Sequence, residues 1–232
     1  NNCFSAAHLN IRSLSANFDE FCVLLADLEH NFDLIGLSET KIKKDVGETA
    51  NTIIAGYDFI SQPTFSNAGG VSLYVKQGLR YHSRDDLSSV TKEFETLWIE
   101  INNNCSKNII CGVIYRHPNG KIEKFNEHLF SVIDRISKGK KSIFMGDINI
   151  NLLNYDTYSL TQDFVNTILI KKLEYYGVRG TACDWFRSYL HDRKIFVTIG
   201  NSSSKEQTVT CGVPQGSVLG PLLYIFAVYK RF

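Results

Sequence analysis

Several polar residues of the 232-residue sequence stand where apolar, strand-like runs end, and their types suit metal-assisted phosphate chemistry. They are Asn10, Glu39, the segment Tyr115–Asn119 (YRHPN), Asp147 and Asn149. A hard cation such as Mg²⁺ prefers carboxylate and carbonyl oxygens together with water and phosphate, and it neutralises the charge that develops when a phosphodiester is attacked. A carboxylate can orient the attacking water, while amide and phenol groups hold phosphate oxygens. This set predicts phosphodiester hydrolysis if the fold brings the side chains together.

Taken one at a time, these residues also fit simpler interpretations. Asn10 and the Gly-Asp-x-Asn segment around Asp147 suit turns, and Glu39 suits the first turn of a helix. Tyr115 fits a sheet edge, and His117 fits an exposed loop. Single positions leave both interpretations open, so the decision depends on the elements that carry them.

Strand-like and helix-like periodicities alternate along the chain, which predicts an α/β domain. We expect strands at residues 3–11, 32–37, 71–75, 97–101, 109–115 and 142–145. We expect amphipathic helices at residues 18–30 and 125–136, the first of them opened by a capping box of Asn17 and Glu20. The alternation in residues 97–101 is typical of a half-buried strand, and Gly69-Gly70 predicts a tight strand entry. Glu39 and Asp147 both end apolar strands, so we expect these carboxylates, 108 residues apart, to converge.

Five segments in order make the pattern more specific. They are LNIRSL, FDLIGLSET, AGGVSLYV, GVIYRHPN and SIFMGDINI. Together they resemble the endonuclease/exonuclease/phosphatase family, in the version carried by LINE-type (non-LTR) retrotransposons, over about residues 4–166. The resemblance implies a two-sheet α/β sandwich. It also implies a phosphodiester endonuclease that uses Mg²⁺ (or Mn²⁺) and acts on DNA.

The same resemblance assigns roles to single residues. Asn10 and Glu39 match metal-site residues, and Asp147 matches the carboxylate that orients the attacking water. The remaining matches are Tyr115 and Asn119 as phosphate contacts, Asn149 as a phosphate- or metal-contacting neighbour of Asp147, and Arg116 as a further phosphate contact.

The pattern of residue types along the sequence changes near residue 169. Residues 182–190 have helical spacing, and residues 195–199 and 207–213 predict a hairpin around a turn at 200–204. The segments KLEYYGVRGTACDWFRSYLHDRKIFVTIG and GVPQGSVLGPLLY resemble a middle section of a non-LTR reverse transcriptase. We therefore divide the chain into an endonuclease-like domain at 1–169 and a reverse-transcriptase-like fragment at 170–232. The two parts differ in charge, with 16 Lys and Arg against 20 Asp and Glu in the first and 9 against 4 in the second.

The basic second part predicts contact with a polyanion, although a solvated basic face would give the same balance. The resemblance makes Arg187, Arg193, Lys194 and Gln215 the candidate nucleic-acid contacts, with DNA, and RNA as a second possibility, as the partner. No obligate protein partner is indicated. The six scattered cysteines include no CxxC and predict reduced thiols inside the cell, in nucleus or cytoplasm. The longest apolar run, 218–229, is broken by Gly220-Pro221, so no membrane span is predicted.

Two motifs that the resemblance leads us to expect are missing. The endonuclease family has a C-terminal Asp-His pair, and reverse transcriptases have Tyr-x-Asp-Asp, but neither occurs in the 232 residues. The missing motifs make the chain resemble an internally deleted copy of such an element. The only methionine is Met145, so residue 1 is not expected to be a translation start and the chain reads as a fragment. We expect an endonuclease by descent that is inactive or weakly active. The alternative is a non-catalytic transposon relic or weak nucleic-acid-binding fragment.

Overall fold

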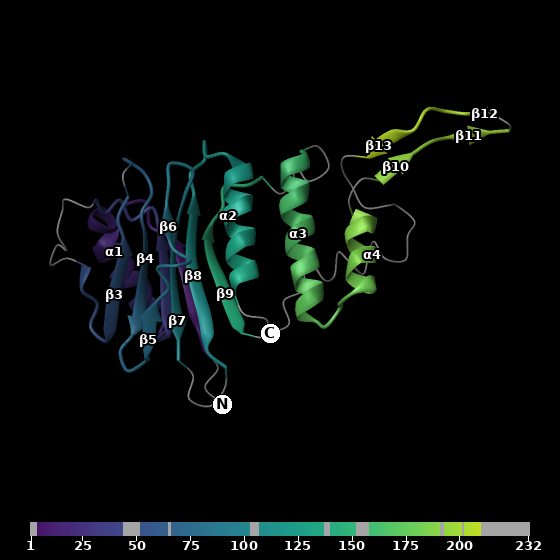
Figure 1. Cartoon of the computed structure of the whole chain (residues 1–232). Coiled ribbons are helices and arrows are strands. Elements are labelled where there is room, and N and C mark those ends of the chain that lie inside the picture. The colour runs from purple at the N-terminus through teal and green to yellow at the C-terminus, as the bar shows by residue number, and fades with distance from the viewer. Residues whose placement is uncertain are drawn as a thin grey trace. The chain divides into compact units, whose positions relative to one another are not determined.

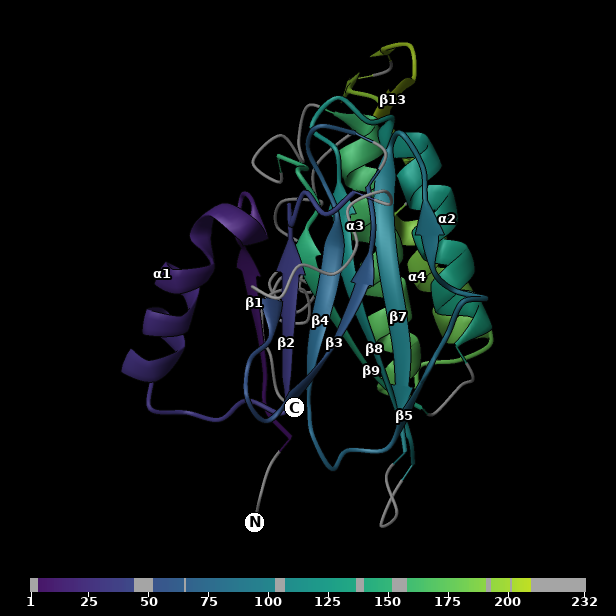
Figure 2. The same cartoon turned by 90° about the vertical axis from the view of Figure 1, so that its left-hand side faces the viewer.

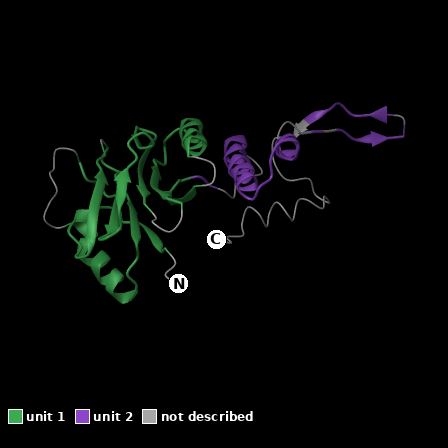
Figure 3. Ribbon diagram, turned by 60° about the horizontal axis from the view of Figure 1, so that its bottom comes forward, with its two compact units in different colours: residues 1–149 green, residues 150–232 purple. Residues whose placement is uncertain are grey.

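The computed structural model divides the chain into two compact units, residues 1–149 and residues 150–232, which are coloured separately in Figure 3. The structure describes residues 4–43, 52–64, 66–102, 107–136, 140–151, 158–190, 193–200 and 202–209.

The first sheet of unit 1 has four strands in the order β1 (Ala6–Asn10), β2 (Leu34–Ser38), β4 (Val71–Lys76) and β3 (Tyr57–Gln62). Strands β1 and β2 run parallel, and helix α1 (Leu14–Asp27) connects them. The other pairs in this sheet are antiparallel. Helix α1 covers the outer face of the sheet, where the Phe21 ring lies 6.0 Å from the Tyr74 ring between centroids.

The second sheet contains β5 (Tyr81–Ser83), β7 (Phe94–Ile101), β8 (Ile109–Arg116) and β9 (Lys141–Asp147), with the short strand β6 (Ser89–Val90) paired to β7. Strands β8 and β9 are parallel and are connected by helix α2 (Ile122–Arg135). Helix α2 packs on the outer face, where Phe125 meets Phe94 edge to face. Figures 1 and 2 show the resulting layers, with α1 outside one sheet and α2 outside the other.

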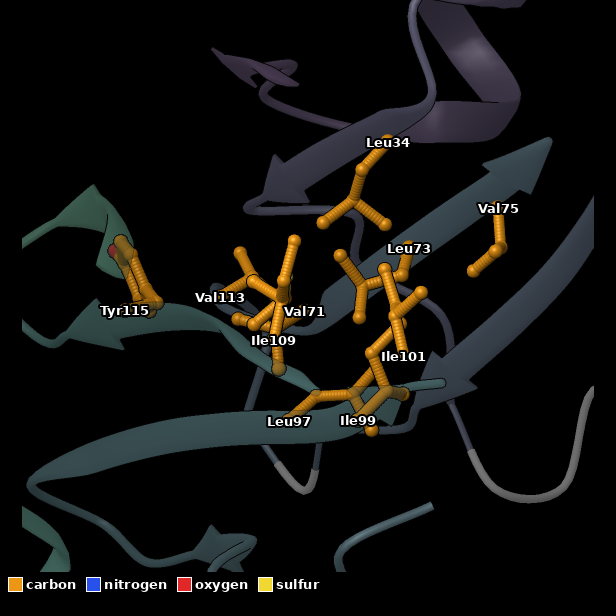
Figure 4. Packing of buried hydrophobic residues seen from close by; sticks show 11 residues of the cluster. Leu34, Val71, Leu73, Val75, Leu97, Ile99, Ile101, Ile109, Val113 and Tyr115 are labelled. Atoms are coloured by element: carbon orange, nitrogen blue, oxygen red, sulfur yellow. The ribbon is translucent and has the colours of Figure 1, made fainter. Parts of the chain in front are cut away.

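The main core lies between the two sheets. Leu73 and Val75 of one sheet meet Ile99 and Val113 of the other in a single buried cluster, whose members are drawn in Figure 4. Such a layered arrangement hides one face of each sheet against the other and the second face under a helix. The predicted α/β two-sheet sandwich is confirmed.

Two local predictions are wrong. The strand expected to be half-buried at residues 97–101 is buried along the whole of β7. On its outer face α2 packs on Phe94 and Thr96, and Arg84 and Lys140 bond to Glu100. Helix α1 begins at Leu14 instead of at an Asn17 cap, and Asn17 lies inside it with non-helical φ and ψ of −116° and 18°. The Asn17 side chain donates a hydrogen bond to the Ile11 carbonyl at 2.7 Å, a local contact that replaces the expected capping box.

Unit 2 contains helices α3 (Ser159–Tyr175) and α4 (Thr181–Leu190), whose contact is an apolar cluster of Leu169, Ile170, Leu173, Cys183 and Leu190. Helix α3, which the sequence analysis did not predict, runs through the proposed division at residue 169, and that division stays a prediction.

A hairpin lies where one was predicted, with shorter strands than expected, and residues 210–213 of the predicted second strand lie outside the described residues. Strand β10 (Arg193–Ile195) pairs with β13 (Gln207–Val209), and β11 (Thr198–Ile199) pairs with β12 (Ser202–Ser203). Gln215 and the GVPQGSVLGPLLY segment lie outside the described residues. Within the described part of the chain, no helix combines the length and apolar character needed to cross a membrane.

Candidate functional site

The candidate residues of unit 1 lie where parallel strand pairs end. Asn10 is the last residue of β1, and Glu39 directly follows β2, its parallel neighbour. In the other sheet Asp147 ends β9 and stands in register with Tyr115 of the parallel strand β8. Parallel strands finish at the same edge of a sheet, so each sheet delivers its polar residues to one edge.

Asn10 joins these two edges. Its side-chain nitrogen donates one hydrogen bond to Glu39 Oε1 at 2.9 Å and another to Asp147 Oδ2 at 3.0 Å. The two carboxylates, which come from different sheets, therefore meet at a single amide group. The predicted convergence of Glu39 and Asp147 is confirmed.

The donor set can be compared with what a metal ion needs. Among the residues that the structure describes, no group of three or more His, Cys, Asp or Glu side chains is placed to hold a metal. Mg²⁺ needs fewer protein ligands than this, because it is commonly held by one or two carboxylates and keeps several waters. Glu39 and Asp147 supply two carboxylates that share only an uncharged amide between them. The residues present therefore fit a hard, water-retaining cation.

Tyr115 is buried at 1% exposure, where β8 runs between β7 and β9, so it does not cap a sheet edge. Figure 4 shows it at one end of the buried cluster. The pKa of its hydroxyl is raised, first by burial, then by the charge of Glu39 and a hydrogen bond with it, and then by Asp147 and Glu95. Tyr115 therefore remains a neutral phenol, a hydrogen-bond donor between acidic groups.

The Asp147–Asn149 turn is tied to Arg116 from both sides. Arg116 donates through Nε to the Ile148 carbonyl at 2.7 Å, through Nη1 to the Gly120 carbonyl at 2.5 Å, and through Nη2 to the Asn149 carbonyl. In return, Asn149 Nδ2 donates to the Arg116 carbonyl at 2.8 Å, and the Asn149 backbone nitrogen donates to Asp147 Oδ1 at 3.1 Å.

This arrangement gives Arg116 internal partners, while its predicted phosphate contact stays a prediction. The side chain is only 2% exposed, and its guanidinium faces backbone carbonyls instead of solvent. A phosphate contact would require it to abandon those acceptors. These hydrogen bonds hold the turn that carries Asp147.

The other predicted residues are less closely gathered. Asn119 is exposed in the turn after β8, and within the described residues its side chain has no hydrogen bond to Asn10, Glu39 or Asp147. In unit 2 Arg187 bridges Asp184 at 2.7 Å and Glu174 at 2.5 Å, and Lys194 pairs with Glu206 at 3.1 Å. The strand placement of Arg193 is described, but its side chain is outside the described set.

Residues that sequence reasoning missed also surround the site. His8 lies two positions before Asn10 on β1, and its Nε2 is 3.2 Å from Ser38 Oγ. Burial lowers the pKa of His8, while nearby Asp147 raises it. Its spacing of two from Asn10 on a predicted strand, which places both on one face, was the available signal.

Glu95 and His117 form a second missed feature. Glu95 is 1% exposed, and its Oε1 is 3.3 Å from His117 Nε2. The His117 side chain is 12% exposed, so its expected position in an exposed loop is wrong. The predicted tight entry at Gly69-Gly70 is confirmed, because both glycines have positive φ, 109° and 87°.

Comparison with solved structures identifies the fold as one used by endonucleases. The chain matches the endonuclease domain of TRAS1, a telomere-specific non-LTR retrotransposon, with a TM-score of 0.55 and 14% identity. The match covers 71% of this chain and 70% of the TRAS1 chain. At this identity the match concerns the fold, a two-sheet α/β sandwich.

Comparison with curated sequences points to the same class of mobile element. The chain is 50% identical over 58 residues to the probable RNA-directed DNA polymerase from transposon BS of Drosophila melanogaster. It is 55% identical over 38 residues to the corresponding protein from transposon X-element of the same species. The alignments span 24% and 16% of this chain but only 6% and 4% of those proteins. No protein-family model matches the chain. The predicted resemblance to non-LTR retrotransposon proteins is confirmed.

Proposed function

We propose that the chain is a retrotransposon-derived, Mg²⁺-dependent phosphodiester endonuclease that nicks DNA at a low rate. Residues 1–169 would supply the nuclease, and residues 170–232 would derive from the reverse-transcriptase part of the element. The observation that carries the proposal is the contact of one amide, Asn10, with the two carboxylates of Glu39 and Asp147.

Each side chain receives a role that its position allows. Glu39 and Asn10 would hold the metal, and a bound Mg²⁺ (or Mn²⁺) would neutralise charge on the phosphate under attack. Asp147, fixed through Asn149 and Arg116, would orient the attacking water. Tyr115 would donate its hydroxyl to a phosphate oxygen, because its raised pKa keeps the proton on the phenol. Asn119 and Asn149 would supply amide donors.

The low rate follows from a group that the 232 residues lack. No Asp-His dipeptide is present to bind the phosphate opposite Asp147. Losing one pre-positioned group of this kind commonly costs a factor of roughly 10²–10³ in rate. Metal binding through Glu39 and Asn10 would suffer less, so the deficit would lie in chemistry.

The second candidate is a non-catalytic relic that binds nucleic acid weakly. The positive balance of residues 170–232, nine basic against four acidic residues, favours it. The pairing of Arg187 and Lys194 with neighbouring acidic residues weakens it, because such contacts compete with phosphate.

A plasmid-nicking assay separates the two candidates. The purified chain should relax supercoiled plasmid slowly with Mg²⁺ or Mn²⁺ and not with EDTA. Asp147→Asn and Glu39→Gln should abolish relaxation, whereas Asp85→Asn, which changes an exposed carboxylate outside the site, should leave it unchanged. Relaxation that persists in Asp147→Asn would contradict the proposal. Binding without any metal-dependent nicking would favour the second candidate.

A further inference from the structure

Glu95 is a buried carboxylate placed beside the candidate site. In the register of the second sheet, Glu95 of β7 stands opposite Tyr115 of β8, and Tyr115 stands opposite Asp147 of β9. Residues opposite one another on neighbouring strands project from the same face of a sheet. Glu95, Tyr115 and Asp147 therefore form one row across three strands, with Tyr115 in the middle.

The Glu95 carboxylate accepts hydrogen bonds from other segments of the chain. Its Oε1 accepts from the Thr64 hydroxyl at 2.5 Å and lies 3.3 Å from His117 Nε2, while its Oε2 accepts from the Gly70 backbone nitrogen. Burying a carboxylate is costly unless several donors surround it. Thr64 and Gly70 precede β4, and His117 follows β8. The Glu95 side chain therefore connects these two segments.

Gly70, which donates to Glu95, is also bonded to the turn that contains Glu39. The Gly70 carbonyl accepts from the Thr40 backbone nitrogen at 3.1 Å, and the Gly69 carbonyl accepts from the Lys41 backbone nitrogen at 2.8 Å. Glu39 itself has φ of 55°, a left-handed conformation that neighbouring contacts must maintain. A Cβ added at Gly70 would lie 2.4 Å from Thr40 Oγ1, so the two turns are in close contact.

His117, which lies beside the Glu95 carboxylate, also packs against Tyr115. The His117 ring meets the Tyr115 ring edge to face, with centroids 5.0 Å apart and an interplanar angle of 78°. The His117 backbone nitrogen is also held, by the Glu93 carbonyl at 2.9 Å. Glu95 thus supports the imidazole that packs against the Tyr115 phenol.

We propose that Glu95 is a positioning residue of the site, which holds Glu39 in place through Gly69-Gly70 and Tyr115 in place through His117. Glu95 touches neither the attacked phosphate nor the metal ligands directly. Its effect on nicking rests on the proposed function, whereas its effect on the geometry of Asn10, Glu39 and Tyr115 does not.

Side-chain amide NMR of the ¹⁵N-labelled full chain tests the geometry without using activity. The Asn10 amide, which donates to both Glu39 and Asp147, is the reporter, and Asn10→Ser identifies its signals. Glu95→Gln should shift these signals. Glu100→Gln is the matched control, because Glu100 is also a buried carboxylate of β7, 4% exposed, but is bound to Arg84 and Lys140. Asn10 signals that move no further in Glu95→Gln than in Glu100→Gln would overturn the proposal.

A second variant covers the case in which Glu95→Gln does not fold. Thr64→Val removes one donor to Glu95 without changing side-chain shape and should shift the Asn10 signals in the same direction by a smaller amount. If the signals stay in place in this variant, the proposal fails as well.

Nicking kinetics then separate positioning from stability. In a nicking-competent chain, Glu95→Gln should lower kcat about 10- to 100-fold, as expected for a displacement of up to about an ångström in catalytic groups. The KM for DNA should change less than about twofold, because Glu95 does not contact substrate. Glu100→Gln should leave kcat unchanged at temperatures where it is folded. If the wild-type chain does not nick, the proposed function fails, and the Asn10 signals alone decide the role of Glu95.

Discussion

Replacing Arg116 with methionine tests whether the guanidinium stabilises the domain through its hydrogen bonds to the turn that carries Asp147. Methionine fills a similar length of side chain but donates nothing to the carbonyls of Ile148, Gly120 and Asn149. The position is 2% exposed, so water cannot reach these acceptors without local opening.

The magnitude follows from the three acceptors. A buried polar group that loses its partner costs roughly 1–3 kcal/mol, and partial relaxation of the turn brings the expected total to about 3–6 kcal/mol. Domains of this kind unfold with only about 5–15 kcal/mol, so the variant should retain a small part of its stability. At roughly 2–4 °C per kcal/mol for a protein of this size, Tm should fall by roughly 6–24 °C.

Urea denaturation followed by circular dichroism gives the free energy of unfolding directly. Arg116→Lys should be intermediate, because a single ammonium cannot serve three carbonyls in a planar fork. Arg135→Met is the control, since Arg135 is half exposed and pairs with Asp86 at 3.3 Å, a contact worth about 0–1 kcal/mol. A loss below about 1 kcal/mol in Arg116→Met, in the range expected of an exposed ion pair, would refute this stabilising role of the guanidinium.

Three further outcomes are expected. Limited proteolysis, followed by mass spectrometry, should remove residues 170–232 before unit 1 is cut, because so short a segment builds little core; a resistant tail would count against this. Binding of a labelled oligonucleotide, followed by anisotropy, should weaken about 10- to 30-fold between 50 and 200 mM salt without sequence preference, since only a few phosphates are neutralised; sequence-selective retention would argue otherwise. For Glu100, burial would raise the pKa, but hydrogen bonds from Lys140, Asn108 and Arg84 outweigh it and lower the pKa from 4.5 to about 2. The stability that Glu100 contributes should therefore be complete above pH 4.5 and lost as pH falls through about 2; an acid-unfolding profile unchanged in Glu100→Gln would oppose this.

The parts of the site that were predictable are those that simple strand patterns determine. Asn10, Glu39, Tyr115 and Asp147 each lie at or next to the end of an apolar run. Their order along the chain then identified the fold. The contact between Asn10 and Glu39 was within reach of such reasoning, because β1 and β2 are parallel and finish together. The contact between Asn10 and Asp147 joins the two sheets and depends on how they pack.

The remaining features depend on contacts between distant segments. No local pattern distinguishes Glu95, which is buried and bound by Thr64, Gly70 and His117, from Glu93 two positions earlier. The internal partners of Arg116 could not be predicted for the same reason. An arginine in a loop motif usually faces solvent, and only the packed turn at Ile148–Asn149 shows that its acceptors are internal.

Backbone strain gives an independent indication of where function lies in unit 1. Among the described residues, six non-glycine positions have positive φ: Arg12, Ser13, Glu29, Glu39, Lys41 and Asn149. Such conformations cost on the order of 1–3 kcal/mol each and persist only where surrounding contacts impose them. Five of the six, all except Glu29, are Glu39 itself or lie within three residues of Asn10, Glu39 or Asp147. A sheet selected for stability alone would place its turns in relaxed conformations, so the concentration of strain around these three side chains supports a site held in shape for chemistry.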